Sequence, residues 1–203
     1  VYLGPSGLGL IGQLSSFLAI LAIISTGAMN NGIVKNLASI GNSDLFNQQK
    51  VIKVALVITF LFTTLTSFAL LLFAPLLADL VFGSNSDLNW VFWVLSFVLF
   101  FQSLFSLFSS ILNGIKAFKV FNLLSIIASI SSLFFCLILV YFYGKNGALL
   151  ALISYQAIVC VFLLFLGKHI PQLKWKVIWE IKFDNTAFIS LAKFSLMTMV
   201  SAI

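Results

Sequence analysis

The chain has 203 residues, of which 62% are hydrophobic and only 8% are charged, and its mean hydropathy is +1.17. A soluble domain is about half apolar and about a quarter charged, so a soluble fold of this size could not cover its surface. All 11 cationic residues are Lys, and the net charge is +6. This composition predicts an integral membrane protein.

The distribution of Lys and Cys excludes two kinds of site. The Lys residues stand singly or in pairs between apolar runs, whereas a nucleic-acid-binding domain gathers its positive charge on one face, so we expect no nucleic-acid partner. Cys136 and Cys160 lie in different apolar runs without a CxxC spacing or a nearby His, and we interpret them as thiols that fill space. We expect no metal and no cofactor.

The first predicted helix covers residues 9–34 and follows a Gly-Pro-Ser-Gly turn at residues 4–7. The glycines there do not form a nucleotide-binding loop, because the strand and amphipathic helix of that motif are absent. The helix ends in polar residues that include Asn31 and Lys35. Polar groups at membrane depth are costly unless they face protein or water. This end therefore either lines a hydrated cavity, where Lys35 attracts an anion, or lets Lys35 extend to the cytoplasmic interface.

Four further uncharged runs are long enough to cross a bilayer, which takes about 20 apolar residues. They predict helices at about 54–78, 90–112, 120–143 and 147–167. Continuous apolar residues at 133–140 exclude the alternating strands of a barrel. Serines at helical spacing suit close packing of helices, while Gln102 is a more suggestive polar group because a buried amide needs partners.

The segment at 168–186 mixes aromatic and aliphatic residues with Lys, which suits a stretch on the cytoplasmic membrane face beside anionic lipid. A further helix follows at 187–203. All Lys residues except Lys145 lie at alternate ends of the predicted helices, so the positive-inside rule places those ends in the cytoplasm. The first predicted helix then runs inward, and we expect at least one outward helix before Val1, in a longer protein.

The acidic residues favour neither an enzyme nor a cation-coupled site. All five fall in predicted loops rather than predicted helices: Asp44, Asp79, Asp87, Glu180 and Asp184. A cation-coupling site or an intramembrane protease usually requires a carboxylate at membrane depth. The sequence also lacks an HExxH motif and the spacing of a catalytic triad, so we expect a transporter rather than an enzyme.

Two blocks near the start of the chain carry a family resemblance. Residues 2–10, Tyr-Leu-Gly-Pro-Ser-Gly-Leu-Gly-Leu, and residues 27–35, Gly-Ala-Met-Asn-Asn-Gly-Ile-Val-Lys, resemble the opening of bacterial O-antigen and enterobacterial-common-antigen flippases. These belong to the multidrug/oligosaccharidyl-lipid/polysaccharide exporter superfamily. Residues 144–150 and 191–197 are also similar to the family's pattern.

The resemblance implies a two-lobe exporter fold. Residues 1–167 would then form most of the N-terminal six-helix lobe without its first helix, residues 168–186 a cytoplasmic linker, and residues 187–203 the start of the second lobe. The implied function is to move an undecaprenyl-pyrophosphate-linked oligosaccharide from the cytoplasmic to the periplasmic leaflet of the bacterial inner membrane, for surface polysaccharide such as O-antigen or common antigen.

The same resemblance gives the candidate substrate-binding residues. Lys35 would attract the pyrophosphate with Asn31 beside it, and Lys193 would lie at the opening of the second lobe. Gln102 is a further candidate for substrate contact because it is an amide within an apolar helix, and not through the resemblance. Without Arg, a bidentate grip on phosphate is not available, and Lys acts as a point charge. The implied partners are the lipid-linked oligosaccharide, membrane lipid and other membrane proteins of glycan assembly.

Three alternatives stay open at this point. A drug or cation antiporter of the same superfamily would require a carboxylate within a helix, which an earlier helix could supply. A membrane polysaccharide polymerase would require a large outer loop with catalytic residues, whereas the predicted outer loops are short. A purely structural membrane subunit is compatible with the composition.

Overall fold

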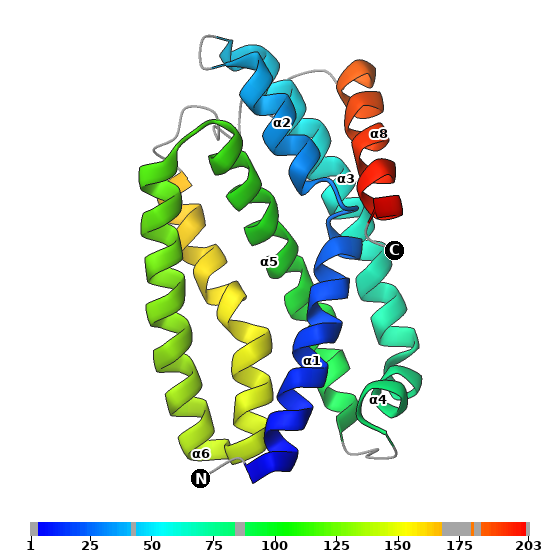
Figure 1. Cartoon of the computed structure of the whole chain (residues 1–203), viewed down its shortest axis with the longest axis vertical. Helices are drawn as coiled ribbons and strands as arrows, with labels where there is room; N and C mark the ends of the chain where they lie inside the picture. Colours follow the sequence, from blue (N-terminus) through cyan, green and yellow to red (C-terminus); the bar gives the residue numbers. More distant parts are fainter. Residues whose placement is uncertain (1–3, 42–43, 84–87, 168–179, 181–183, 202–203) are drawn as a thin grey trace.

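The computed structural model describes residues 4–41, 44–83, 88–167, 180 and 184–201. The regular structure in these residues is helical, and the helices pack into one bundle (Figure 1). Four stretches of helix are long and apolar enough to cross a membrane: Gly7–Ser25, Leu45–Leu72, Asn89–Gly114 and Phe118–Tyr155. The predicted all-α transmembrane bundle is confirmed.

The segment predicted as one helix at 9–34 contains a break. Helix α1 spans Gly4–Ser25 and helix α2 spans Asn30–Ile40. Between them Gly27 and Ala28 have positive φ angles of 60° and 55°. Glycine adopts this left-handed conformation readily, whereas Ala adopts it at a cost. Every residue of the break is uncharged, so hydropathy alone does not reveal it.

A second break divides the helix predicted at 54–78. Helix α3 spans Leu45–Leu72 and helix α4 spans Ala74–Phe82. α3 begins early because the Asp44 carboxylate accepts a backbone N–H of its first turn at 3.1 Å, which is the usual role of an N-cap. α4 is separate because Pro75 lies in its first turn and has no N–H with which to continue α3.

The next two elements follow the sequence prediction closely. Helix α5 spans Asn89–Gly114, where a helix at 90–112 is predicted. Helix α6 spans Phe118–Gly167, but Gly144 has a non-helical φ of 55° and ψ of −125°, and the chain reverses its direction there (Figure 1). We call the parts before and after Gly144 the first and second arms of α6. They correspond to the two helices predicted around this turn.

The last element, α8, spans Asn185–Ser201 and packs against α2 and α3. Most of the linker predicted at 168–186 lies outside the described residues. The segment at 187–203 is predicted to begin a second lobe. Its described residues belong to α8 and so pack against α2 and α3. Its position places α8 beside the polar end of α2.

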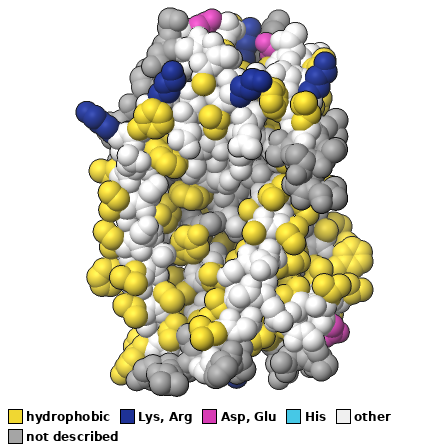
Figure 2. Space-filling view, viewed as in Figure 1, with side chains coloured by type: hydrophobic (Ala, Val, Ile, Leu, Met, Phe, Trp, Pro, Cys, Tyr) yellow, Lys and Arg dark blue, Asp and Glu magenta, His cyan; other side chains and the backbone are white. Residues whose placement is uncertain are grey.

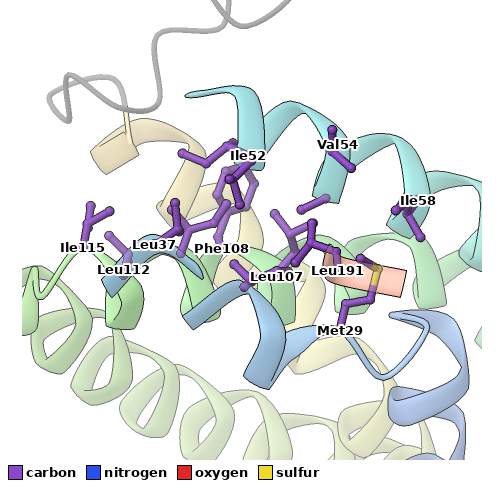
Figure 3. Close-up of a cluster of buried hydrophobic side chains, with 14 of the residues drawn as sticks. Met29, Leu37, Ile52, Val54, Ile58, Leu107, Phe108, Leu112, Ile115 and Leu191 are labelled. Carbon is purple, nitrogen blue, oxygen red and sulfur yellow. The ribbon is translucent and has the colours of Figure 1, made fainter. Parts of the chain in front are cut away.

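Two clusters of buried hydrophobic side chains fill the bundle. One joins α2, α3, α5 and α8 and is shown in Figure 3; it includes Met29, Leu37, Ile52, Phe108 and Leu191. The other joins α1, α4, α5 and the second arm of α6, and includes Leu14, Ala78, Phe92, Leu95 and Leu149. α5 contributes to both clusters and is the most buried of the four apolar stretches, so it is the central helix of the bundle.

The surface agrees with a membrane environment. Hydrophobic side chains cover the sides of the molecule, while most of the visible Lys side chains gather at one end (Figure 2). The first arm of α6 exposes large apolar side chains that include Ile126, Leu133, Phe134, Leu137 and Phe142. Lipid tails are as apolar as these side chains, so such a surface carries no penalty in a bilayer. We call the end with most of the Lys residues the lysine-rich end.

Candidate functional site

Two glycines allow α2 to lie very close to the helices on either side of it. A Cβ atom added to Gly114 of α5 would lie 2.8 Å from the Cβ of Leu37, and one added to Gly32 of α2 would lie 2.9 Å from the Cβ of Phe194 in α8. Small residues at such positions let helix backbones approach each other in membranes. α2 is therefore enclosed between α5 and α8.

The break between α1 and α2 is held by hydroxyl groups from neighbouring helices. Thr63 of α3 donates to the carbonyl of Ser25 at 3.0 Å, and Ser195 of α8 donates to the carbonyl of Gly27. Carbonyl groups at a helix end need such partners, because an unpaired polar group at membrane depth is costly. α8 therefore contributes to the structure at the start of α2.

Two amides of α2 face opposite neighbours. The Asn30 amide donates to the Ser106 hydroxyl of α5 at 3.0 Å, whereas the Asn36 carbonyl oxygen accepts from the Ser190 hydroxyl of α8 at 3.0 Å. The Asn30 Oδ1 atom is buried and has no hydrogen-bond partner among the described residues. Polar contacts thus connect α2 to both α5 and α8.

Lys35 is exposed on α2, and its ammonium lies 4.5 Å from the centre of the Phe194 ring of α8. A cation over an aromatic face is attracted by the ring's quadrupole. Asn31 is exposed one turn earlier, on the same face of α2. Lys193 is exposed on α8 next to Phe194, but successive residues of a helix do not share a face. Three of the four candidate residues thus lie on the adjacent helices α2 and α8.

The start of α2 adds a further positive element beside Asn31. Its N-cap residue, Met29, makes no side-chain capping hydrogen bond. The N–H groups of a first turn and the helix dipole favour an anion at such an N-terminus; Met29 is only 1% exposed, so this end reaches the surface at Asn31. Lys35, Asn31 and this helix end together form the candidate site.

Gln102, the fourth candidate, does not share this surface. It is only 7% exposed and lies on α5 one turn before Ser106, the partner of Asn30. Residues four apart share a face of a helix, so Gln102 lies in the interior near the start of α2. The nearby serines mostly bond within their own helix, as Ser103 does to the Leu99 carbonyl at 2.8 Å, which favours packing rather than substrate contact for them.

An ion pair connects α3 to the start of α8. The Lys50 ammonium lies 3.6 Å from the Asp184 carboxylate, and both side chains are about a quarter exposed, at 27% and 24%. Asp184 also caps α8, since it accepts the Thr186 hydroxyl at 2.6 Å and the Thr186 N–H at 2.9 Å. The Thr186 hydroxyl first, and then the backbone N–H groups and Lys50, lower the pKa of the Asp184 carboxyl.

A polar cavity of about 270 Å³ lies between α2, α3 and α8. Its lining includes Lys50 and Asp184, together with Asn36 and Ser190. Water can therefore reach both the ion pair and the amide contact between α2 and α8. This cavity adjoins the hydrophobic cluster shown in Figure 3, against which α8 packs through Leu191.

One sequence-based expectation about the carboxylates was wrong. Asp79 was expected in a loop, but it lies in α4 and is exposed, because Pro75 starts a new helix there. α4 has only nine residues, and the four apolar stretches named above contain no Asp or Glu. Among the described residues, no group of three or more His, Cys, Asp and Glu could hold a metal ion.

The sequence does not reveal the partners of the α2 amides. Asn36 and Ser190 are 154 positions apart and Asn30 and Ser106 are 76 apart, so no local pattern connects them. The amide side chains near Lys35 were the only sequence feature that indicated a site here. They indicated a site on α2 but not which helices α2 contacts.

Four apolar helical stretches long enough to span a membrane define a polytopic helical membrane protein. The family described as polysaccharide biosynthesis protein matches residues 2–203, and the chain belongs to this family. The family connects the chain with the synthesis or export of polysaccharide. Comparison with curated proteins and with solved structures gives no match.

Proposed function

We propose that this protein is a transporter that moves an oligosaccharide linked to undecaprenyl pyrophosphate from the cytoplasmic to the periplasmic leaflet of the bacterial inner membrane. Membership of the polysaccharide biosynthesis family supports a glycan substrate, and the apolar helices support a membrane location. In this proposal the lysine-rich end faces the cytoplasm, as the positive-inside rule requires. The protein would bind the substrate first at that end.

The position of Lys35 is the observation that carries the proposal. Lys35 is an exposed residue one turn after Asn31, on a helix whose start has no capping side chain. A pyrophosphate at this place would meet a cation, an amide and the positive end of a helix dipole. Lys acts here as a point charge without the fixed fork of Arg, which suits a group that must be released again.

The physical task explains why a protein is needed. Each sugar hydroxyl moved through lipid without a partner costs about 1–3 kcal/mol, so several sugars do not cross unaided. A hydrated path along protein removes most of this cost while the lipid tail stays in the bilayer. An inside-negative potential favours the outward movement of anions by about 2.3 kcal/mol for each charge and for every 100 mV of potential. Alternating access, by movement of one group of helices against another, would complete the transfer.

The experiment uses the full-length gene in bacteria that lack their own flippase. We expect surface polysaccharide to return and the accumulated cytoplasmic precursor to disappear. Lys35→Ala should lower surface polysaccharide strongly while the amount of protein in the membrane stays the same. Lys119→Ala is the matched control, because Lys119 is also an exposed Lys, near the start of α6, and this change should have little effect.

Two other outcomes would contradict parts of the proposal. If Lys35→Ala lowers the amount of protein and the transport together, Lys35 anchors the helix at the interface and is not a substrate contact. If the well-expressed full-length protein leaves the precursor in place across several glycan types, the flippase assignment fails. The antiporter and polymerase alternatives would then be tested with drug-resistance and chain-length assays.

A further inference from the structure

α8 is joined to the rest of the bundle by polar contacts along its length. Asp184, which caps the helix, pairs with Lys50, and Ser190 bonds to Asn36. One turn later Phe194 covers the Lys35 ammonium, and Ser195 bonds to a carbonyl of the break before α2. The contacts reach both α2 and α3.

The contact between α2 and α5 is more extensive than the contact between α2 and α8. Leu37, Phe108, Ile111 and Leu112 in this region are at most 1% exposed, and Gly114 leaves no room for a Cβ beside Leu37. Close-packed surfaces of this kind either stay together or lose their contacts as a unit. α2 and α5 are therefore expected to move as one body.

Water can replace the two polar contacts of α8 that line the cavity, but not the packing between α2 and α5. The cavity of about 270 Å³ is lined by both members of the ion pair and by both members of the Asn36–Ser190 contact. When such groups separate, each finds water instead of remaining unpaired. Of the two surfaces of α2, the one facing α8 is the one that can open reversibly.

We propose that α8 is a releasable clasp that occupies Lys35 when it is docked on α2 and α3. While the Phe194 ring lies over the Lys35 ammonium, an anion must compete with the ring for that cation; when α8 separates, this competition ends. A pyrophosphate group therefore favours the separated state, because a ligand shifts an equilibrium by its differential affinity for the two states. This inference rests on the proposed function, since it makes substrate binding and opening of α8 a single event.

Two matched cysteine pairs test the clasp in the full-length protein. Asn36→Cys with Ser190→Cys joins α2 to α8, and Asn30→Cys with Ser106→Cys joins α2 to α5. Both replace an Asn–Ser hydrogen bond of 3.0 Å. Cys136 and Cys160 are first replaced by Ala. A short bifunctional thiol reagent that a reductant cleaves is applied to spheroplasts, and lipid-linked glycan in the outer leaflet is measured.

Crosslinking the α2–α8 pair should lower transport to about one tenth, and the reductant should restore it. Crosslinking the α2–α5 pair should leave transport within about twofold of the untreated protein. Full transport by the crosslinked α2–α8 pair would overturn the clasp. Equal loss in both pairs would also overturn it, because transport would then need general flexibility of α2.

A second measurement separates failure of the clasp from failure of the proposed function. If the cysteine-free parent moves no glycan, the purified protein with Ser190→Cys is labelled with a maleimide. Asp184→Asn removes the charge that pairs with Lys50 but keeps a good N-cap residue, and it should raise the labelling rate by up to about fivefold. Ser106→Cys is the control and should not respond. An unchanged rate at residue 190 would overturn the clasp whatever the protein transports.

Discussion

Lys35 and Phe194 come from helices near opposite ends of the chain, and the Lys35 ammonium lies 4.5 Å from the centre of the Phe194 ring. The two helices meet closely there, because Gly32, one turn before Lys35, would place a Cβ only 2.9 Å from the Cβ of Phe194. An aromatic face attracts a cation without neutralising it. The contact therefore holds Lys35 in place and leaves its charge available to a stronger partner.

Replacing Phe194 by Leu should strengthen anion binding at Lys35. An exposed cation–π contact is worth about 0.5–1 kcal/mol, so its loss should lower the Kd for inorganic pyrophosphate about threefold. Phe194→Trp should raise the Kd, because Trp attracts cations more strongly than Phe. Isothermal titration of the purified full-length protein with pyrophosphate measures both. Equal Kd values for the three proteins would show that the ring does not compete with the anion.

The sequence predicted the class of the fold but not all of its helix ends. Length and apolar composition identify spanning helices, and the reversal at Gly144 follows from a turn sequence with two glycines. The breaks at Gly27 and Phe73 were missed, because both lie within uncharged residues. Hydropathy averages over many residues, whereas a break depends on the backbone of one or two, such as Gly27 with its φ of 60° or Pro75 with its missing N–H.

The sequence predicted the residues of the candidate site on α2 but not the residues that contact them from other helices. Lys35 and Asn31 stand out because polar residues are rare in an apolar helix. The partners of α2 depend on which helices lie beside it, and this is decided by the fit of side chains such as Gly32, Gly114 and Leu191. Such fit leaves no periodic signal, so the contacts of Asn36 and Phe194 with their neighbours are visible only in the structure.

Gly114→Ala should destabilise the protein through the contact between α2 and α5. The added methyl group would lie 2.8 Å from the Cβ of Leu37, and overpacking of a tight contact costs about 1–3 kcal/mol. Leu37→Ala in the same protein should not recover the loss, because Ala keeps the Cβ atom and the change empties a fully buried site. Gly12→Ala is the control, because no atom lies within 4 Å of the added Cβ there, and Ala should be neutral or favourable. Thermal unfolding of the purified protein measures all three, and equal effects at residues 114 and 12 would contradict the close approach.

Asp184 should make the stability of the α8 contact depend on pH. Hydrogen bonds from Thr186 and the nearby Lys50 lower the pKa of this carboxyl from its ordinary value of 3.8. The ionised group therefore stabilises the folded protein above that value, and the contribution is lost as the pH falls through the lower folded pKa. Asp184→Asn should reduce the Tm at pH 6, and the difference from the native protein should shrink below pH 4.

Asp79→Asn is the control for this pH dependence, because it removes one negative charge from an exposed position on α4. Its Tm should follow that of the native protein over the same pH range. The role of Asp184 would be contradicted if Asp184→Asn and the native protein differed by the same amount at every pH. A constant difference would mean that the side chain acts through its shape as a cap and not through its charge.

Thr63 and Thr59 lie one turn apart in α3, are 1% and 2% exposed, and should respond differently to replacement by Val. Thr63 donates to the Ser25 carbonyl at 3.0 Å, and loss of an interhelical hydrogen bond in a membrane protein costs about 0.6 kcal/mol on average. The Thr59 hydroxyl is buried without a hydrogen-bond partner among the described residues, so Thr59→Val removes an unpaired polar atom and should be neutral or stabilising. Thermal unfolding of the two variants decides between them. If Thr59→Val is the more destabilising, the Thr59 hydroxyl is bonded in the membrane and the polar region around the break extends further along α3.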